Sequence, residues 1–174
     1  MNNFFSIFIT LFISAFLLSC SGTDKNENTQ KDDSKAGLGS FPDVTFTTLE
    51  GDELSMNDLK GKVVFVNFWA TWCAPCRREI PDFISFQEQY GGDDFTIVGV
   101  SLDEEGFEVV EPYAKEMGIN YPLVVDNQNL GDKLGGIFAV PTTYFVDEKG
   151  DIVGRKIGYF PEEQMKEQIN KMLD

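Results

Sequence analysis

The sequence predicts an α/β domain in which helices flank a mixed central sheet. Short apolar runs typical of buried strands alternate with segments whose apolar residues recur at helical spacing. The last two such runs are joined by a turn that contains glycine, so they should form an antiparallel pair. The length of 174 residues allows one ordinary domain and a short appendage. The chain is 42% hydrophobic and 25% charged, which is a globular balance.

The first half of the predicted domain contains a hairpin, a buried strand and a helix. Residues 44–47 alternate apolar and polar side chains and precede a turn at 50–52, which predicts a short hairpin. Residues 63–69, with the sequence VVFVNFW, are expected to form a strand buried on both faces. A helix should begin near Pro75, because proline suits the first helical turn. Its expected apolar positions are Cys76, Ile80, Phe83, Ile84 and Tyr90.

The middle of the domain is predicted to add another strand, a helix and a short strand. Residues 95–102 form an apolar run that indicates a second buried strand. Apolar side chains recur at helical spacing from 107 to 117, and Gly118 is suited to end that helix. Residues 121–125 predict a short strand.

The end of the chain predicts a hairpin and a last helix. Residues 142–146 and 152–154 are apolar and flank the turn at 147–150, so the pair should be antiparallel. The last helix begins at Pro161. Its apolar side is expected to carry Met165, Ile169, Met172 and Leu173.

The composition excludes several classes of site. The chain contains no histidine, which removes imidazole bases, Ser-His-Asp and Cys-His pairs, and His-ligated metals or haem. It has 14 Lys and Arg against 29 Asp and Glu, whereas nucleic-acid binding needs a dense basic surface. Three cysteines are too few for a zinc site made of cysteine alone. We therefore expect no metal, no cofactor and no nucleic-acid partner.

Residues 1–19 are predicted to be a lipoprotein signal peptide. They contain no charged side chain, and the apolar run at 4–18 is shorter than the about 20 residues of a comfortable membrane span. The run ends in Leu17-Leu18-Ser19-Cys20, which resembles the lipobox of bacterial lipoproteins, where the signal is cut before a cysteine that is then lipidated. An uncleaved membrane anchor is the alternative. Either anchor places the rest of the chain outside the cytoplasm, in a compartment that permits disulfides.

A flexible linker is predicted between the anchor and the domain. Residues 20–40 contain the cysteine expected to be lipidated and a polar segment whose one large apolar residue is Leu38. Such a segment cannot bury enough surface to fold. The folded domain is therefore expected to span residues 41–174.

The segment at 72–76, with the sequence WCAPC, carries the predicted chemistry. Two cysteines three residues apart at a helix start have their Cα atoms within disulfide range, roughly 4.4–6.8 Å. The free N–H groups and the helix dipole favour a thiolate at Cys73, whose pKa should fall from about 8.5 toward roughly 3.5–7.5. Cys76 lies one turn inward and should be the buried resolving thiol. Pro75 fixes its own φ and stiffens the loop.

Residues 68–81, with the sequence FWATWCAPCRREIP, resemble the active-site segment of the TlpA/ResA-like branch of the thioredoxin-fold superfamily. Residues 140–144 (VPTTY) resemble the cis-proline loop of that superfamily, and the segment from Gly99 to Asp126 resembles the central insertion of the branch. The resemblance covers residues 41–174. It implies a thioredoxin-like fold with an N-terminal hairpin and a central βα insertion.

The resemblance also implies which residues contact a client protein. It implies a cis peptide bond between Val140 and Pro141 beside the disulfide, where Val140 would offer backbone groups to an extended peptide. The alternative is an ordinary trans proline at the start of a strand. Trp72 and Pro75 are expected to belong to the same contact surface.

Glu79 is the expected proton carrier for Cys76. Thioredoxins proper have a buried Asp at the position that Asn67 occupies here, and Asn67 cannot titrate. In the TlpA/ResA-like branch a Glu three residues after the second cysteine is a frequent substitute, and that residue is Glu79. The alternative is that Glu79 is merely an acidic residue favoured near a helix N-terminus.

The expected activity is thiol–disulfide exchange through a redox disulfide between Cys73 and Cys76. The resemblance favours reduction of disulfides in exported proteins, often within cytochrome c maturation. Because the compartment is oxidising, a membrane thiol donor should be needed to recycle the pair. We expect the protein to be a monomer. The acidic charge either serves solubility or attracts basic clients.

Two other functions of the same fold remain as alternatives. A peroxiredoxin-like peroxidase uses a Pro and a Thr before its cysteine, where this chain has Val66 and Ala70. A copper-binding chaperone adds a third ligand, usually histidine, and the chain has none.

Overall fold

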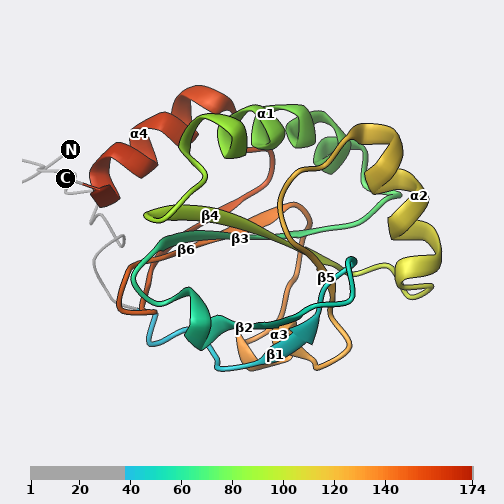
Figure 1. Ribbon diagram of the computed structural model, residues 1–174, viewed down its shortest axis with the longest axis horizontal. Coiled ribbons are helices and arrows are strands. Elements are labelled where there is room, and N and C mark those ends of the chain that lie inside the picture. The colour runs from blue at the N-terminus through green and yellow to red at the C-terminus, as the bar shows by residue number, and fades with distance from the viewer. Residues whose placement is uncertain (1–37, 174) are drawn as a thin grey trace, which may run out of the picture. The chain divides into compact units, whose positions relative to one another are not determined.

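A five-stranded mixed sheet forms the middle layer of the fold (Figure 1). The computed structural model describes residues 38–173. The strands of the sheet are β3 (Val63–Trp69), β4 (Phe95–Ser101), β5 (Leu123–Val125), β6 (Thr142–Val146) and β7 (Ile152–Ile157). Their order is β5-β4-β3-β6-β7. The first three pair in parallel, whereas β6 is antiparallel to both β3 and β7. This arrangement confirms the predicted mixed sheet with an antiparallel pair at one edge.

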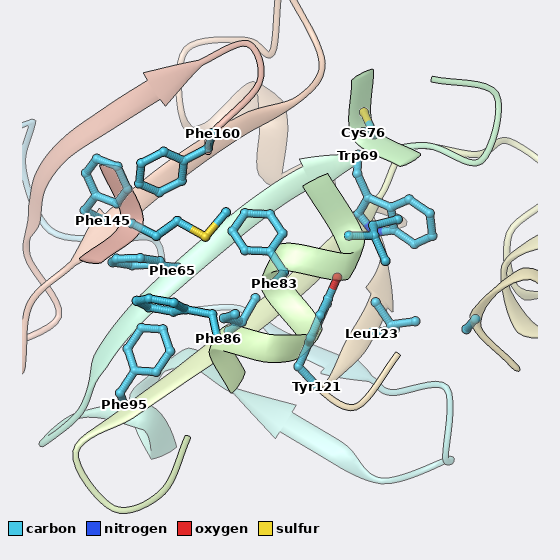
Figure 2. Packing of buried hydrophobic residues seen from close by; sticks show 14 of the residues in the cluster. Phe65, Trp69, Cys76, Phe83, Phe86, Phe95, Tyr121, Leu123, Phe145 and Phe160 are labelled. Carbon is cyan, nitrogen blue, oxygen red and sulfur yellow. The ribbon is translucent and has the colours of Figure 1, made fainter. Parts of the chain in front are cut away.

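Helices α1 (Ala74–Tyr90), α2 (Phe107–Met117) and α4 (Glu162–Leu173) pack on one face of the sheet (Figure 1). Successive side chains of a strand point to opposite faces, so Phe65 on β3 faces these helices while its neighbours face the other side. The ring of Phe65 lies within 6.2 Å of the rings of Phe86, Phe95, Phe145 and Phe160, measured between centroids. Figure 2 shows this aromatic cluster, which extends to Trp69 and Cys76.

A second core fills the opposite face of the sheet, where Val64, Val66 and Phe68 of β3 point. It is covered by the antiparallel hairpin of β1 (Thr45–Thr47) and β2 (Glu53–Ser55), by the 3₁₀ helix η2 (Met56–Leu59) and by α3 (Leu130–Lys133). The hairpin confirms the sequence prediction. Neither short helix was predicted, because four residues are too few to show a helical apolar period.

Several element boundaries differ from the sequence predictions by a few residues. Strand β5 begins at Leu123 rather than at 121, and Pro122, which has no N–H to donate to a ladder, precedes it. Residues 38–40, which the sequence assigned to the linker, extend the edge of the sheet. The N–H of Leu38 donates to the carbonyl of Ile152 at 3.3 Å, and Ser40 forms a bridge with Asp151.

The predicted signal peptide and Cys20 lie outside the described residues. Among residues 38–173, no helix has the length and apolar character needed to cross a membrane.

Candidate active site

The two cysteines lie where β3 passes into α1. The N–H of Cys73 donates to the carbonyl of Ala70 at 3.1 Å and closes a tight turn after the strand. Cys73 is the N-cap of α1, and Pro75 occupies its first turn, where a missing N–H costs no helical hydrogen bond. The helix therefore begins one residue before the predicted start, and a buried strand and a helix N-terminus fix the position of the motif.

Cys73 and Cys76 form a disulfide, with their Cα atoms 5.3 Å apart. The backbone N–H of Cys76 donates to Cys73 Sγ at 3.2 Å. After reduction, this N–H and the positive end of the helix dipole favour a thiolate at Cys73. Cys73 is 4% exposed and Cys76 is 0% exposed. The predicted order of exposure is thus correct, although a client sulfur can reach only a small part of the outer cysteine.

The loop before β6 contains the cis peptide bond between Val140 and Pro141 that the family resemblance implied. The carbonyl of Pro141 accepts a 2.8 Å hydrogen bond from the N–H of Gly158, which follows β7. Val140 is half-buried and packs against the apolar cluster that includes both cysteines. The sheet thus holds this loop against the same cluster as the disulfide.

Two large apolar side chains near these segments face solvent. Trp72, which precedes Cys73, is 66% exposed, and Phe138, which precedes the cis-proline loop, is 91% exposed. Phe68 and Trp69 are buried, as packing residues should be. Arg78 lies over the ring of Tyr159, 5.3 Å from its centroid. Sequence reasoning did not single out Phe138, because one phenylalanine in a glycine-containing loop carries no periodic signal.

Glu79 is fully buried one turn after Cys76. Its Oε1 accepts a 2.9 Å hydrogen bond from Asn67 Nδ2, and its Oε2 accepts a 3.0 Å hydrogen bond from the N–H of Phe160. Burial raises the pKa of Glu79 from 4.5 to about 7, the two hydrogen bonds oppose this rise, and the charge of Asp82 adds to it. The carboxyl can therefore exchange a proton near neutral pH.

A second buried carboxylate, Asp103, lies just after β4 and was not recognised as a site residue from the sequence. It accepts hydrogen bonds from Thr71, which lies in the turn before Cys73, and from Ser101. One signal could have identified it. An Asp directly after a buried parallel strand lies at the same edge of the sheet as the loop that follows the neighbouring strand.

Within residues 38–173, no group of three or more Cys, Asp and Glu side chains is arranged to hold a metal ion.

Several proteins with similar sequences or structures are named as thiol–disulfide oxidoreductases or interchange proteins. The profile described as the AhpC/TSA family matches residues 39–155. Thiol-disulfide oxidoreductase ResA of Bacillus thuringiensis (strain Al Hakam) is 35% identical over 135 residues, which cover 76% of this chain and 73% of the relative. Sporulation thiol-disulfide oxidoreductase A of Bacillus subtilis (strain 168) is 36% identical over 122 residues, covering 69% of this chain and 73% of the relative.

A crystal structure of a thiol:disulfide interchange protein of the thioredoxin family, from Chlorobium tepidum TLS, superposes with a TM-score of 0.71. Its sequence is 33% identical, and the match covers 78% of this chain and 96% of that one.

Proposed function

Because this chain belongs to the AhpC/TSA family and is a thiol-disulfide oxidoreductase similar to ResA, we propose that its Cys73–Cys76 pair reduces disulfides in exported proteins. The fold and family agree with those predicted from residues 68–81 and 140–144. We also propose the direction of electron flow, the clients and the location of the protein. The observation that carries the proposal is the disulfide at the N-terminus of α1, in which Cys73 retains a small exposed fraction and Cys76 has none.

The proposed reaction has two exchange steps. The Cys73 thiolate attacks one sulfur of the client disulfide, so a bond forms between Cys73 and that sulfur while the client disulfide breaks. The departing client sulfur takes up a proton. Cys76 then loses its proton and attacks Cys73 Sγ, which forms the intramolecular disulfide and releases the second client sulfur as a thiol. Two electrons pass from the protein to the client, and a membrane thiol donor returns them.

Glu79 is the proposed proton acceptor for Cys76. A buried thiol needs a base before it can attack, and Glu79 lies one helical turn from Cys76 on the buried side of α1. A pKa of about 7 lets the carboxylate take a proton from the thiol and return it during the cycle. Asn67 and the N–H of Phe160 hold the carboxyl in place.

The client is proposed to bind across the exposed edge of Cys73. Trp72 supplies an exposed aromatic surface, and Pro75 and Val140 are partly accessible beside the cluster that contains the disulfide. The cis Val140–Pro141 segment offers backbone groups to an extended peptide. Such pairing tolerates many client sequences, because backbone hydrogen bonds do not depend on side chains.

The proposed location is outside the cytoplasm, on the periplasmic or extracytoplasmic side of a bacterial membrane, with a lipid at Cys20 as the anchor. The support is the uncharged apolar run at 4–18 and the cysteine at its end. We propose a role in cytochrome c maturation by a monomeric protein, whose formal net charge of −15 would attract basic clients such as cytochrome c polypeptides.

Capture of a client with Cys76→Ser tests the proposal. Without the resolving thiol, the Cys73–client disulfide should accumulate in intact cells and be released by a reductant. Cys73→Ser is the matched control, because it retains one thiol but loses the exposed one. Failure to form an adduct while Cys73 still reacts with an alkylating reagent would contradict the two-step reaction.

Peroxide reduction and copper carriage are the other functions that this fold supports. Both positions that would hold the Pro and Thr of a peroxidase carry buried apolar residues, Val66 and Ala70. An assay of peroxide consumption separates the peroxidase from the reductase. Tight stoichiometric copper binding without reductase activity would favour the carrier.

A further inference from the structure

We propose that Asp103 is a positioning residue, which holds the turn before Cys73 in the shape that thiol–disulfide exchange requires. The inference rests on the proposed function in one respect, namely that Cys73 is the attacking thiol. It concerns a carboxylate that takes no part in the proton transfer assigned to Glu79.

Asp103 is bonded to the turn through both of its carboxylate oxygens. Oδ1 accepts from Thr71 Oγ1 at 2.6 Å and from the N–H of Thr71 at 3.2 Å. Oδ2 accepts from the same N–H at 3.0 Å and from Ser101 Oγ at 2.8 Å. The N–H of Asp103 itself donates to Ser101 Oγ at 3.0 Å. The side chain is 2% exposed, so these bonds are shielded from competing water.

The residue that Asp103 holds is the first of the two central residues of the tight turn. Ala70 and Cys73 are the ends of this turn, joined by the bond from the Cys73 N–H to the Ala70 carbonyl. Thr71 and Trp72 lie between them. A fixed Thr71 therefore limits the backbone rotations by which Cys73 could leave the N-cap position.

The sheet makes the position of Asp103 rigid. Strands β3 and β4 are parallel and in register, so that Trp69 lies opposite Ser101 at their carboxyl ends. The N–H of Leu102 donates to the carbonyl of Trp69 at 2.9 Å and continues this pairing. We call the hydrogen bonds between Asp103 and Thr71 the clamp. It joins the end of the central strand β4 to the turn that carries Cys73.

A carboxylate suits this role better than an amide would. The groups that face it are the N–H and hydroxyl of Thr71 and the hydroxyl of Ser101, and all of them donate. A carboxylate has acceptors on both oxygens, whereas Asn presents an amide group with two donors in place of one oxygen. Asp103→Asn therefore keeps the size of the side chain and weakens the clamp at one oxygen.

The expected consequence is a change in the redox equilibrium. Without the clamp, the reduced turn gains conformations in which Cys73 lies away from Cys76, so the effective concentration of one thiol at the other falls. The intramolecular disulfide should then form less readily. We expect the equilibrium constant for its formation against glutathione disulfide to fall by at least about fivefold in Asp103→Asn, as for the loss of one charge-assisted hydrogen bond.

The experiment compares four variants with the wild-type protein in glutathione buffers of defined ratio, with the oxidised fraction measured after acid quenching and thiol labelling. Thr71→Val removes the bond between the Thr71 hydroxyl and Asp103 at a half-buried position, so the variant should fold even if Asp103→Asn does not. Thr71→Ser restores the hydroxyl. Glu104→Gln removes a neighbouring exposed carboxylate and controls for the loss of charge alone.

The clamp predicts a shift toward the dithiol in Asp103→Asn and, to a smaller extent, in Thr71→Val, with wild-type values in Thr71→Ser and Glu104→Gln. Wild-type equilibrium constants in both Asp103→Asn and Thr71→Val would overturn it, as would an equal shift in Glu104→Gln. If Asp103→Asn does not fold, the comparison of Thr71→Val with Thr71→Ser decides. A wild-type protein that exchanged with no thiol would instead contradict the proposed function.

Discussion

Glu79 Oε1 lies 2.9 Å from the amide nitrogen of Asn67, so that a titrating carboxyl is held by a neighbour that cannot titrate. Asn67 also donates to Thr143 Oγ1 at 3.0 Å, which joins β3 and β6 beneath the first turns of α1. The amide thus supplies a hydrogen bond to Glu79 without supplying a competing charge. The buried carboxyl of Glu79 has a pKa of about 7.

The stability of the oxidised protein should depend on pH through Glu79. Its pKa is about 7 in the folded state and 4.5 when the carboxyl is unperturbed. The folded state therefore binds the proton more tightly, so the contribution of Glu79 to stability is fully present below pH 4.5 and is lost as pH rises through about 7. The loss is at most roughly 3 kcal/mol. Chemical denaturation at intervals of pH measures the free energy of unfolding over this range.

Glu79→Gln is the variant that isolates this effect. The amide does not titrate, so the loss of stability with rising pH that we assign to Glu79 should disappear. The NH₂ group would face the donors Asn67 and Phe160, and this adds a cost that does not change with pH. An equally steep fall in wild type and Glu79→Gln would show that other groups cause it. Glu104→Gln, at an exposed position, should keep the wild-type slope.

Asn67→Asp should place two buried carboxyls next to each other. Because like charges oppose joint ionisation, the variant should bind a proton at a higher pH than wild type and lose additional stability above pH 7. The expected cost at pH 8 is about 2 kcal/mol or more, and it should shrink on acidification. Urea unfolding at pH 8 and pH 5 tests this expectation. Asn67→Ala removes the same hydrogen bonds without adding charge. Because the bond to Glu79 favours the carboxylate, the cost of Asn67→Ala should also rise with pH, but by less than that of Asn67→Asp.

The strands and the redox motif were predictable because their signals are local. The apolar runs at 63–69 and 95–102 are long enough to indicate buried strands, and proline after the first cysteine marks a helix start. By contrast, Phe86 belongs to the buried side of α1 but was not among the apolar positions predicted for that helix. Asp126, whose carboxylate accepts from the N–H groups of Leu130 and Gly131, stabilises a helix too short to show a period.

The parts of the site that sequence could not predict come from distant segments. The pKa of Glu79 depends on the N–H of Phe160, which lies 81 residues away along the chain. The contact of Thr71 with Asp103 spans 32 residues and depends on the register of β3 against β4. Neither distance follows from spacing or composition, because each is set by how the sheet and the following loops pack.

Trp72→Ala should impair the reduction of protein clients more than the reduction of small disulfides. The indole is 66% exposed, so its loss should change the free energy of unfolding by no more than about 0.5 kcal/mol. An aromatic contact surface beside Cys73 favours an extended polypeptide, whereas glutathione disulfide needs only the sulfur. We expect client reduction to slow by at least about fivefold while glutathione disulfide reacts at nearly the wild-type rate.

Val153→Ala is the matched control, because it shortens a partly exposed apolar side chain on the edge strand β7. It should leave both rates unchanged. If Trp72→Ala reduced both substrates more slowly by the same factor, Trp72 would position Cys73 rather than contact the client. Rates are measured by the disappearance of a fluorescent client disulfide and by thiol release from glutathione disulfide.

Gly99→Ala should destabilise the protein, because Gly99 lies in the central strand β4 among buried side chains. A Cβ atom at Gly99 would lie 2.5 Å from Leu123 Cδ2 and 3.2 Å from Trp69 Nε1, and both neighbours are buried. Buried side chains cannot move aside freely, so overpacking of this kind costs typically about 1–3 kcal/mol. Gly92→Ala is the control, because nothing lies within 4 Å of its added Cβ. The double variant Gly99→Ala, Leu123→Ala should recover part of the cost relative to additivity, since the shorter side chain makes room. Unfolding free energies that add without any recovery would contradict the assignment of the strain to Leu123.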